Sequence, residues 1–72
     1  MKFAVTAVAV SRKTRRRVGK ARTEIIDTAS NTFFDGVTNA LAVEARYEAF
    51  WNDLNPNSPD IVKVVDVREV QS

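Results

Sequence analysis

The sequence predicts an α+β fold of ββαβ order, with a three-stranded antiparallel sheet and one amphipathic helix on one face. Three observations support this fold class. β-Branched residues are concentrated near the two ends of the chain, and an apolar repeat of helical period lies between them. The length of 72 residues provides only one small hydrophobic core, so residues 1–72 are expected to form a single domain.

Two strands are expected at residues 1–10 and 20–29. In the first, both alternating sets of side chains are apolar or small, as in a central strand. In the second, charged side chains alternate with small or apolar ones until Asp27, where the break in the pattern predicts a bulge. The basic segment 12–22, which contains Gly19, is expected to form the long tip of a β-hairpin.

The helix is expected from about Asp35 to Leu54. Side-chain oxygens in residues 30–32 are available to cap its start, although Gly36 weakens the first turn. Its apolar side chains recur at intervals of three and four residues, the spacing of one helix face; they are Ala40, Val43, Tyr47, Phe50 and Leu54. Pro56 and Pro59 end the helix, because each disfavours helical geometry in the residue before it.

A third strand is expected at residues 61–70, where valine recurs and the alternation slips at Asp66. A right-handed crossover returns this strand to the side of the first one, which gives the sheet order 2-1-3. The helix then covers one face of the sheet and leaves the other face uncovered.

The charge of the chain is divided between two parts. Residues 12–22 hold seven of the eleven basic residues and no acid, whereas residues 23–72 hold nine acids and three basic residues. The candidate binding residues are Arg12, Lys13, Arg15, Arg16, Arg17, Lys20 and Arg22. Their mutual repulsion would be relieved by a negatively charged partner. The alternative is a solvated loop that keeps the protein in solution.

The composition of this basic segment indicates the kind of partner. The predominance of arginine over lysine favours recognition of phosphate or carboxylate groups. No aromatic residue lies within residues 12–22, which argues against stacking on bases and against sequence-specific readout. Backbone phosphates or an acidic protein surface are therefore the expected contacts.

The end of the helix is aromatic. Tyr47 and Phe50 are expected in the core, whereas Trp51 lies at the edge of the apolar stripe, where interface anchors are found. The helix also carries a smooth, uncharged set of side chains, Ala42, Ala45 and Ala49. Together with Trp51 these alanines are candidates for a protein-docking surface. The alternative is that they reflect helix propensity alone.

The titratable residues suggest neither catalysis nor metal binding. Glu44 and Glu48 share a helix face, but no further ligand converges on them, so a solvated face is expected. Four other acids are expected to form an acidic pole far from the basic tip: Asp53, Asp60, Asp66 and Glu69. The chain has no His and no Cys, and its small core is expected to leave little room for a pocket of roughly several hundred cubic ångströms. We therefore expect no enzymatic activity, no metal and no cofactor.

The apolar run at residues 3–10 is too short to cross a membrane, and no small-residue cleavage site follows it. The absence of Cys agrees with a reducing compartment. A cytoplasmic protein with no membrane partner is expected.

The order strand, basic loop, strand, helix, strand, with Trp51 late in the helix, resembles small bacteriophage proteins that bind host RNA polymerase. Such inhibitors and antitermination factors are short and non-enzymatic. The resemblance extends over the whole chain in element order and charge, and it implies that Arg15, Arg16 and Arg17 lie against the polymerase or emerging RNA. The chain also resembles a small archaeal large-subunit ribosomal protein with a basic first hairpin, but residues 23–72 are more acidic than in such proteins.

Three functional hypotheses follow. The first is a phage-type viral transcription regulator that binds bacterial RNA polymerase and nascent RNA through the basic hairpin and a docking face, altering initiation or termination. The second is a general, ribosome-associated RNA-binding protein that uses phosphate contacts. The third is a small structural homo-oligomer that pairs through the uncovered sheet face or an edge strand.

Overall fold

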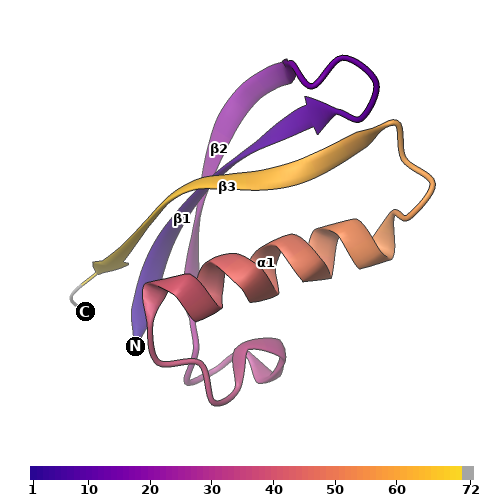
Figure 1. Ribbon diagram of the computed structural model, residues 1–72. Coiled ribbons are helices and arrows are strands. Elements are labelled where there is room, and N and C mark those ends of the chain that lie inside the picture. Colours follow the sequence, from indigo (N-terminus) through magenta and orange to yellow (C-terminus); the bar gives the residue numbers. More distant parts are fainter. Residues whose placement is uncertain (71–72) are drawn as a thin grey trace.

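The computed structural model describes residues 1–70. The chain forms β1 (Lys2–Ser11), β2 (Arg17–Asp27), a short 3₁₀ helix η1 (Thr32–Phe34), α1 (Ala40–Leu54) and β3 (Asp60–Val70). The strands pair antiparallel in the order β2-β1-β3 (Figure 1), which confirms the predicted fold class.

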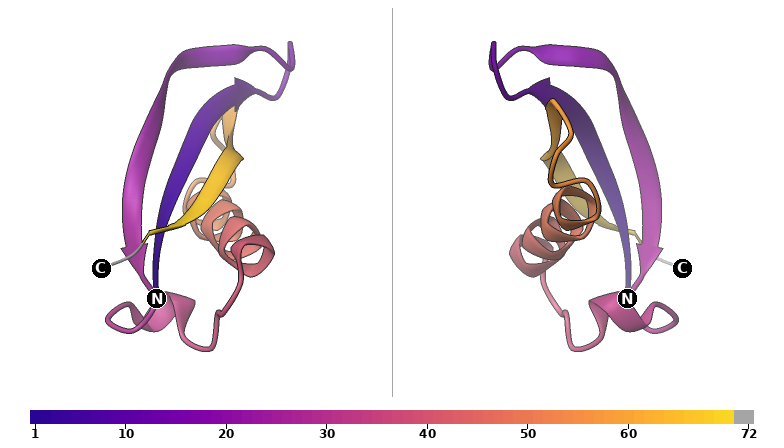
Figure 2. Two further views of the ribbon diagram at one scale, coloured as in Figure 1. Left: turned by 90° about the vertical axis from the view of Figure 1, so that its left-hand side faces the viewer. Right: turned by 90° about the vertical axis from the view of Figure 1, so that its right-hand side faces the viewer.

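The molecule has two layers, a twisted sheet and one helix. Figure 2 shows α1 on one side of the sheet, while no element of residues 1–70 covers the other side. Alternate residues of β1 point toward α1, as the period of a strand requires. The core between the layers consists of Phe3, Val5, Ala7, Ile26, Phe34, Val37, Val43, Tyr47 and Val64.

The helix begins at Ala40 rather than at Asp35, so the expected start of the helix is wrong. Gly36 has a φ of 80°, a left-handed conformation that interrupts helical geometry. The preceding turn, η1, is capped by Asn31, whose Oδ1 accepts a hydrogen bond from the backbone N–H of Phe33 at 3.0 Å. A second cap, Asn39, starts α1.

The hairpin loop is shorter than the sequence pattern indicates. β2 begins at Arg17, so the loop is confined to residues 12–16, and the basic residues beyond it lie on a strand. The expected bulge near Asp27 is also displaced, because the pairing of β1 with β2 shifts between Val18 and Arg22 instead. Gly19, with a φ of 80°, lies within this irregular segment.

The slip in the valine pattern of β3 is a bulge. Thr6 of β1 pairs with Asp66 and the next residue of β1 pairs with Val64, which leaves Val65 without a partner on β1. Because of this extra residue, Val67 on one side of the bulge and Val64 on the other both face α1. The sequence located this irregularity correctly, and the structure settles which face of β3 is buried.

Candidate interaction surfaces

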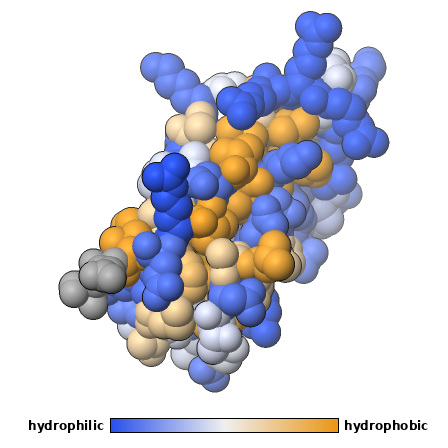
Figure 3. Space-filling model, turned by 60° about the vertical axis from the view of Figure 1, so that its left-hand side comes forward, coloured by the Kyte–Doolittle hydropathy of each residue, from blue (hydrophilic) through white to orange (hydrophobic). Residues whose placement is uncertain are grey.

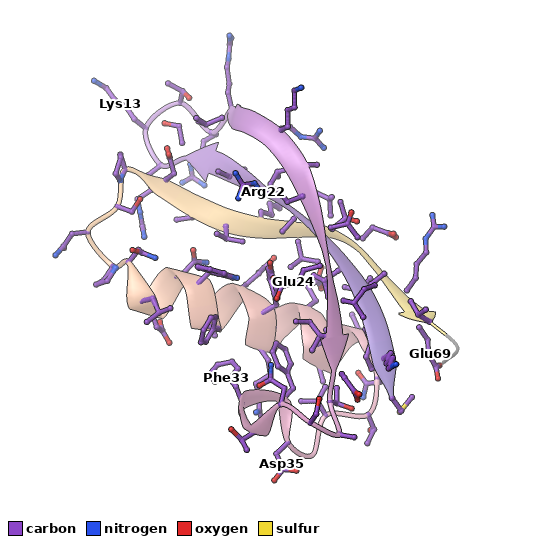
Figure 4. All side chains as sticks on the ribbon, turned by 180° about the vertical axis from the view of Figure 1, so that it is seen from behind. Lys13, Arg22, Glu24, Phe33, Asp35 and Glu69 are labelled. Atoms are coloured by element: carbon purple, nitrogen blue, oxygen red, sulfur yellow. The ribbon has the colours of Figure 1, made fainter. Side chains whose placement is uncertain are left out.

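The arginine tip, residues 12–17, lies at one end of an elongated molecule. The principal extents of the molecule are 37 × 20 × 16 Å. Figure 4 shows Lys13 projecting into solvent at this end, while Glu69 lies near the opposite end. The basic side chains of residues 12–22 are all exposed.

The tip is held to the start of β3 through backbone carbonyl groups. The side-chain Nε of Arg12 donates to the carbonyl oxygen of Ser58 at 2.9 Å, and its backbone N–H donates to Pro59 at 2.8 Å. Arg15 has a φ of 63°, a left-handed conformation that is uncommon for residues other than Gly, Asn and Asp.

The cations of the tip are not neutralised by the protein's own acids. Within residues 1–70 the ion pairs join Arg68 to Asp66 at 2.9 Å and the Met1 amino group to Asp27 at 3.9 Å. Neither pair involves the tip. The positive charge at this end of the molecule is therefore available to a partner.

The expected acidic pole does not form, so that prediction is wrong. Asp60 pairs opposite Ser11, beside the arginine tip, whereas Glu69 pairs opposite Phe3 near the other end of β1. Asp66 is bonded to Arg68 between them. The reason is that β3 runs along the length of the sheet and distributes its acids along the long axis.

A groove opens where β2 diverges from α1. Its volume is about 690 Å³, and Ala9 on β1, Val18 and Arg22 on β2, and Tyr47 and Trp51 on α1 are among its lining residues. A smaller hollow of about 160 Å³ shares Tyr47 and Trp51 and extends the groove toward Phe33. The expectation of little room for a pocket of this size is therefore wrong, because the groove lies beside the core rather than inside it.

Aromatic rings form one wall of the groove. Phe33 stacks edge-on against Phe50 with ring centroids 4.8 Å apart, and Phe50 packs likewise against Trp51 at 5.4 Å. Tyr47 is buried in the core as expected, while Phe50 is only partly buried. Trp51 is 36% exposed, which agrees with its predicted position at the edge of the apolar stripe.

The alanines of the proposed docking surface do not lie beside Trp51. Ala42 is partly buried and packs against the core, while Ala45 and Ala49 are exposed. At about 3.6 residues per turn, Trp51 lies roughly half a turn around the helix from Ala49. The structure therefore divides this candidate surface into an aromatic groove wall and a separate small-residue face.

One hydrogen bond bridges the groove. The hydroxyl group of Tyr47 donates to Oε1 of Glu24 at 3.1 Å, and Figure 4 shows Glu24 on the same side of β2 as α1. Burial raises the pKa of the Tyr47 hydroxyl group above its ordinary value, and the negative charge of Glu24 raises it further. Sequence analysis missed this link, because Glu24 belongs to the charged set of alternating β2 side chains and the pattern did not place that set toward the helix.

At Val62 and Val64, the outer edge of β3 is closed by side chains of α1. Asn52 accepts a hydrogen bond from the N–H of Val62 at 2.8 Å and donates to its carbonyl oxygen at 3.2 Å. Glu48 accepts a hydrogen bond from the N–H of Val64 at 2.8 Å. Glu48 is thus bonded to the sheet, so the expectation that it belongs to a merely solvated face is wrong.

The outer edge of β2 is open. No side chain within the described part of the chain bonds to its outward backbone groups between residues 17 and 26 in the manner of Asn52. The side chains of β2 are exposed from Arg17 to Ile25. The two outer strands therefore differ, because β3 has outward backbone groups bonded to α1 and β2 has none between residues 17 and 26.

The side of the sheet that faces away from α1 also exposes apolar side chains. Ile25 is 55% exposed on β2, and Val65 is 45% exposed at the bulge of β3. In the view of Figure 3, apolar side chains form a band along the molecule between charged ones. This bare face is a second apolar surface, separate from the groove.

The described residues 1–70 contain no cluster of three or more acidic, His or Cys side chains placed to hold a metal ion. None of the helices in that range has the length and hydropathy needed to cross a bilayer. In comparisons with known proteins, no protein-family model, curated protein or solved structure matches this chain.

Proposed function

We propose that the protein is a non-enzymatic binding protein that attaches to the phosphate backbone of RNA through the arginine tip and thereby regulates a transcription complex in the cytoplasm. One observation carries this proposal: the exposed cations of the tip have no acidic partner within residues 1–70. Phosphate oxygens provide the missing charge, and arginine can bind them with two parallel hydrogen bonds.

The conformation of the tip supports a functional reason for its charge. Arg15 occupies a left-handed position at which Gly or Asn would be less strained. By contrast, the basic residues elsewhere include Arg68, which is paired with Asp66, and Arg46, which donates to the carbonyl oxygen of Phe33. Within the tip, Arg15 combines a left-handed backbone with a side chain that has no acidic partner within residues 1–70.

RNA polymerase is the proposed setting, because the resemblance to phage polymerase-binding proteins rests on the same hairpin. In this arrangement the bare sheet face, with Ile25 and Val65, contacts the enzyme while the tip reaches emerging RNA. A homo-oligomer joined through that same face is the second candidate, since such exposed apolar side chains favour burial.

Binding of a fluorescent single-stranded RNA at increasing salt tests the phosphate contacts. Replacement of Arg15, Arg16 and Arg17 together by Gln should weaken binding at low salt by about tenfold or more. The logarithmic salt slope should fall by about 2 if three phosphate contacts are lost. The matched control replaces Arg46, Lys63 and Arg68 by Gln, which removes the same charge from the other part of the chain. Equal loss of binding in the two triple variants would contradict the proposal.

Purified bacterial RNA polymerase tests the setting. Immobilised protein should retain the polymerase after nuclease treatment, and Ile25→Gln should weaken retention while leaving RNA binding unchanged. Failure to retain polymerase with or without RNA would refute the transcription setting alone. Sedimentation of a concentrated sample as a dimer that Ile25→Gln dissociates would favour the homo-oligomer.

A further inference from the structure

The groove and the open edge of β2 lie next to each other and have no role in phosphate binding by the tip. We propose that they bind an acidic peptide segment of a partner protein in an extended conformation. The segment adds as a strand to the outer edge of β2, and one of its large apolar side chains enters the groove between β2 and α1. This surface goes beyond the proposed function, because it requires neither RNA nor polymerase.

The backbone of β2 is positioned to accept a further strand. Val62 and Val64 of β3 turn their N–H groups toward α1, so the residues opposite them on β1 turn theirs toward β2. The backbone N–H and C=O groups of successive residues in a strand point to opposite edges, and those of Thr23 and Ile25 therefore point away from β1, to the outer edge of β2. β2 contains no proline, so every residue of this edge retains its N–H donor.

The groove supplies a place for an apolar anchor. Val18 is 46% exposed on the β2 wall, and Trp51 is 36% exposed on the α1 wall. Both residues line the hollow of about 690 Å³. A side chain that enters there covers these apolar atoms without disturbing the core. Exposed aromatic residues beside such a hollow are typical anchors of peptide binding.

Charge selects the partner. The half of β2 that borders the groove carries Arg17, Lys20 and Arg22 and no acid, and the acid that follows, Glu24, is bonded to Tyr47. A peptide that carries Asp or Glu on the side chains flanking its apolar anchor complements these cations. An acidic segment is therefore favoured over a neutral or basic one.

A second copy of this chain is a poorer occupant. The β2 strand of a second molecule would present Arg22 and Glu24 on the groove side, where an apolar side chain is needed. Basic residues on an edge strand also oppose pairing with an identical strand. The same cations attract an acidic strand, so they discriminate between the two occupants.

A fluorescent nine-residue peptide in which Glu alternates with Val around a central Phe is the probe. Fluorescence anisotropy should show saturable binding to the full-length protein at low salt. Replacement of the central Phe by Ala, of all Glu by Lys, or methylation of alternate backbone nitrogens should each weaken binding about tenfold or more. Equal binding of the N-methylated peptide would overturn strand addition, and equal binding of the Lys peptide would overturn the charge argument.

A matched pair of protein variants locates the site. Val18→Gln should weaken binding by about tenfold, whereas Val65→Gln should leave it unchanged, although the two valines are 46% and 45% exposed. A triple variant of the loop residues Lys13, Arg15 and Arg16, each replaced by Gln, leaves Arg17 of β2 intact and should retain most of the peptide binding while it loses RNA. No binding of the probe at millimolar concentration, loss in the triple variant alone, or a β2-mediated dimer in sedimentation would each overturn the proposal.

Discussion

β2 and β3 are the two outer strands of one sheet, but they differ in how their edges end. Asn52 and Glu48 of α1 bond to the outer backbone groups of Val62 and Val64 on β3, whereas no side chain within residues 1–70 does so along most of β2. The difference shows that the helix stabilises one side of the molecule and leaves the other available for binding. The groove and the open edge lie on the β2 side, and the arginine tip connects β1 to β2 at one end of the sheet.

The composition of the two strands explains this asymmetry. On the side of the sheet that faces α1, Val64 and Val67 of β3 lie opposite the same β1 residues as Arg22 and Glu24 of β2. A helix gains more by covering valines than by covering charges. α1 is therefore drawn to β3, and β2 diverges from it over the groove.

The largest expected effect comes from the same substitution on the two outer strands. Val64 is 4% exposed and Val18 is 46% exposed. Val64→Ala should lower the free energy of unfolding by about 2–3 kcal/mol, since it removes two buried methyl groups and leaves a cavity. Val18→Ala should change it by less than about 0.5 kcal/mol. Urea unfolding measures both free energies, and equal losses would contradict the claim that α1 stabilises the β3 side of the sheet more than the β2 side.

A smaller effect is expected from opening the edge of β3. Asn52→Ala leaves the N–H and carbonyl groups of Val62 without their side-chain partners and should cost about 1–2 kcal/mol of unfolding free energy. Hydrogen exchange of the Val62 amide should accelerate toward that of Thr23 on β2. Asp53→Ala, at an exposed neighbouring position, is the control. An unchanged exchange rate at Val62 would show that the edge is closed by something else.

The sequence was sufficient for the fold because each element carries its own period. Valine recurs along β3, and the slip at Asp66 marked the bulge at its true place. The helix start was misplaced because Asn31 and Asn39 both offer capping side chains, and only the left-handed conformation of Gly36 separates the turns that they cap. Local patterns thus predict elements better than they predict boundaries.

The candidate sites were only partly predictable. The unpaired charge of the arginine tip follows from composition, because residues 12–22 contain no acid. The groove was not predicted, because the alternation of charged and apolar residues in β2 does not by itself state which of its two faces lies toward α1. The acidic pole failed for a similar reason, because the spacing of acids in sequence does not state how β3 spreads them in space.

The hydrogen bond between Tyr47 and Glu24 should respond to alkaline pH. The raised pKa of Tyr47 means that the folded state favours the neutral hydroxyl group. The stabilisation is complete below the ordinary value of 10.0 and is lost as the pH rises through the folded-state pKa. Tyr47→Phe should lower the free energy of unfolding by about 1 kcal/mol at neutral pH. The variant should not show the loss of stability at alkaline pH that ionisation of Tyr47 causes. If the variant loses stability at alkaline pH to the same extent, a group other than Tyr47 is responsible for the loss.

The smallest expected effect concerns strain in the arginine tip. Arg15→Asn and Arg16→Asn remove the same charge, but only position 15 has a left-handed backbone among the non-glycine residues described. Arg15→Asn should raise the free energy of unfolding by up to about 1 kcal/mol, because Asn tolerates this conformation and one repulsive charge is lost. Arg16→Asn should have an effect of less than about 0.5 kcal/mol. If Arg15→Asn stabilises the fold and also weakens RNA binding, then the arginine at position 15 lowers the stability of the protein and contributes to RNA binding. If it stabilises the fold with RNA binding unchanged, the strain at position 15 has no part in that function.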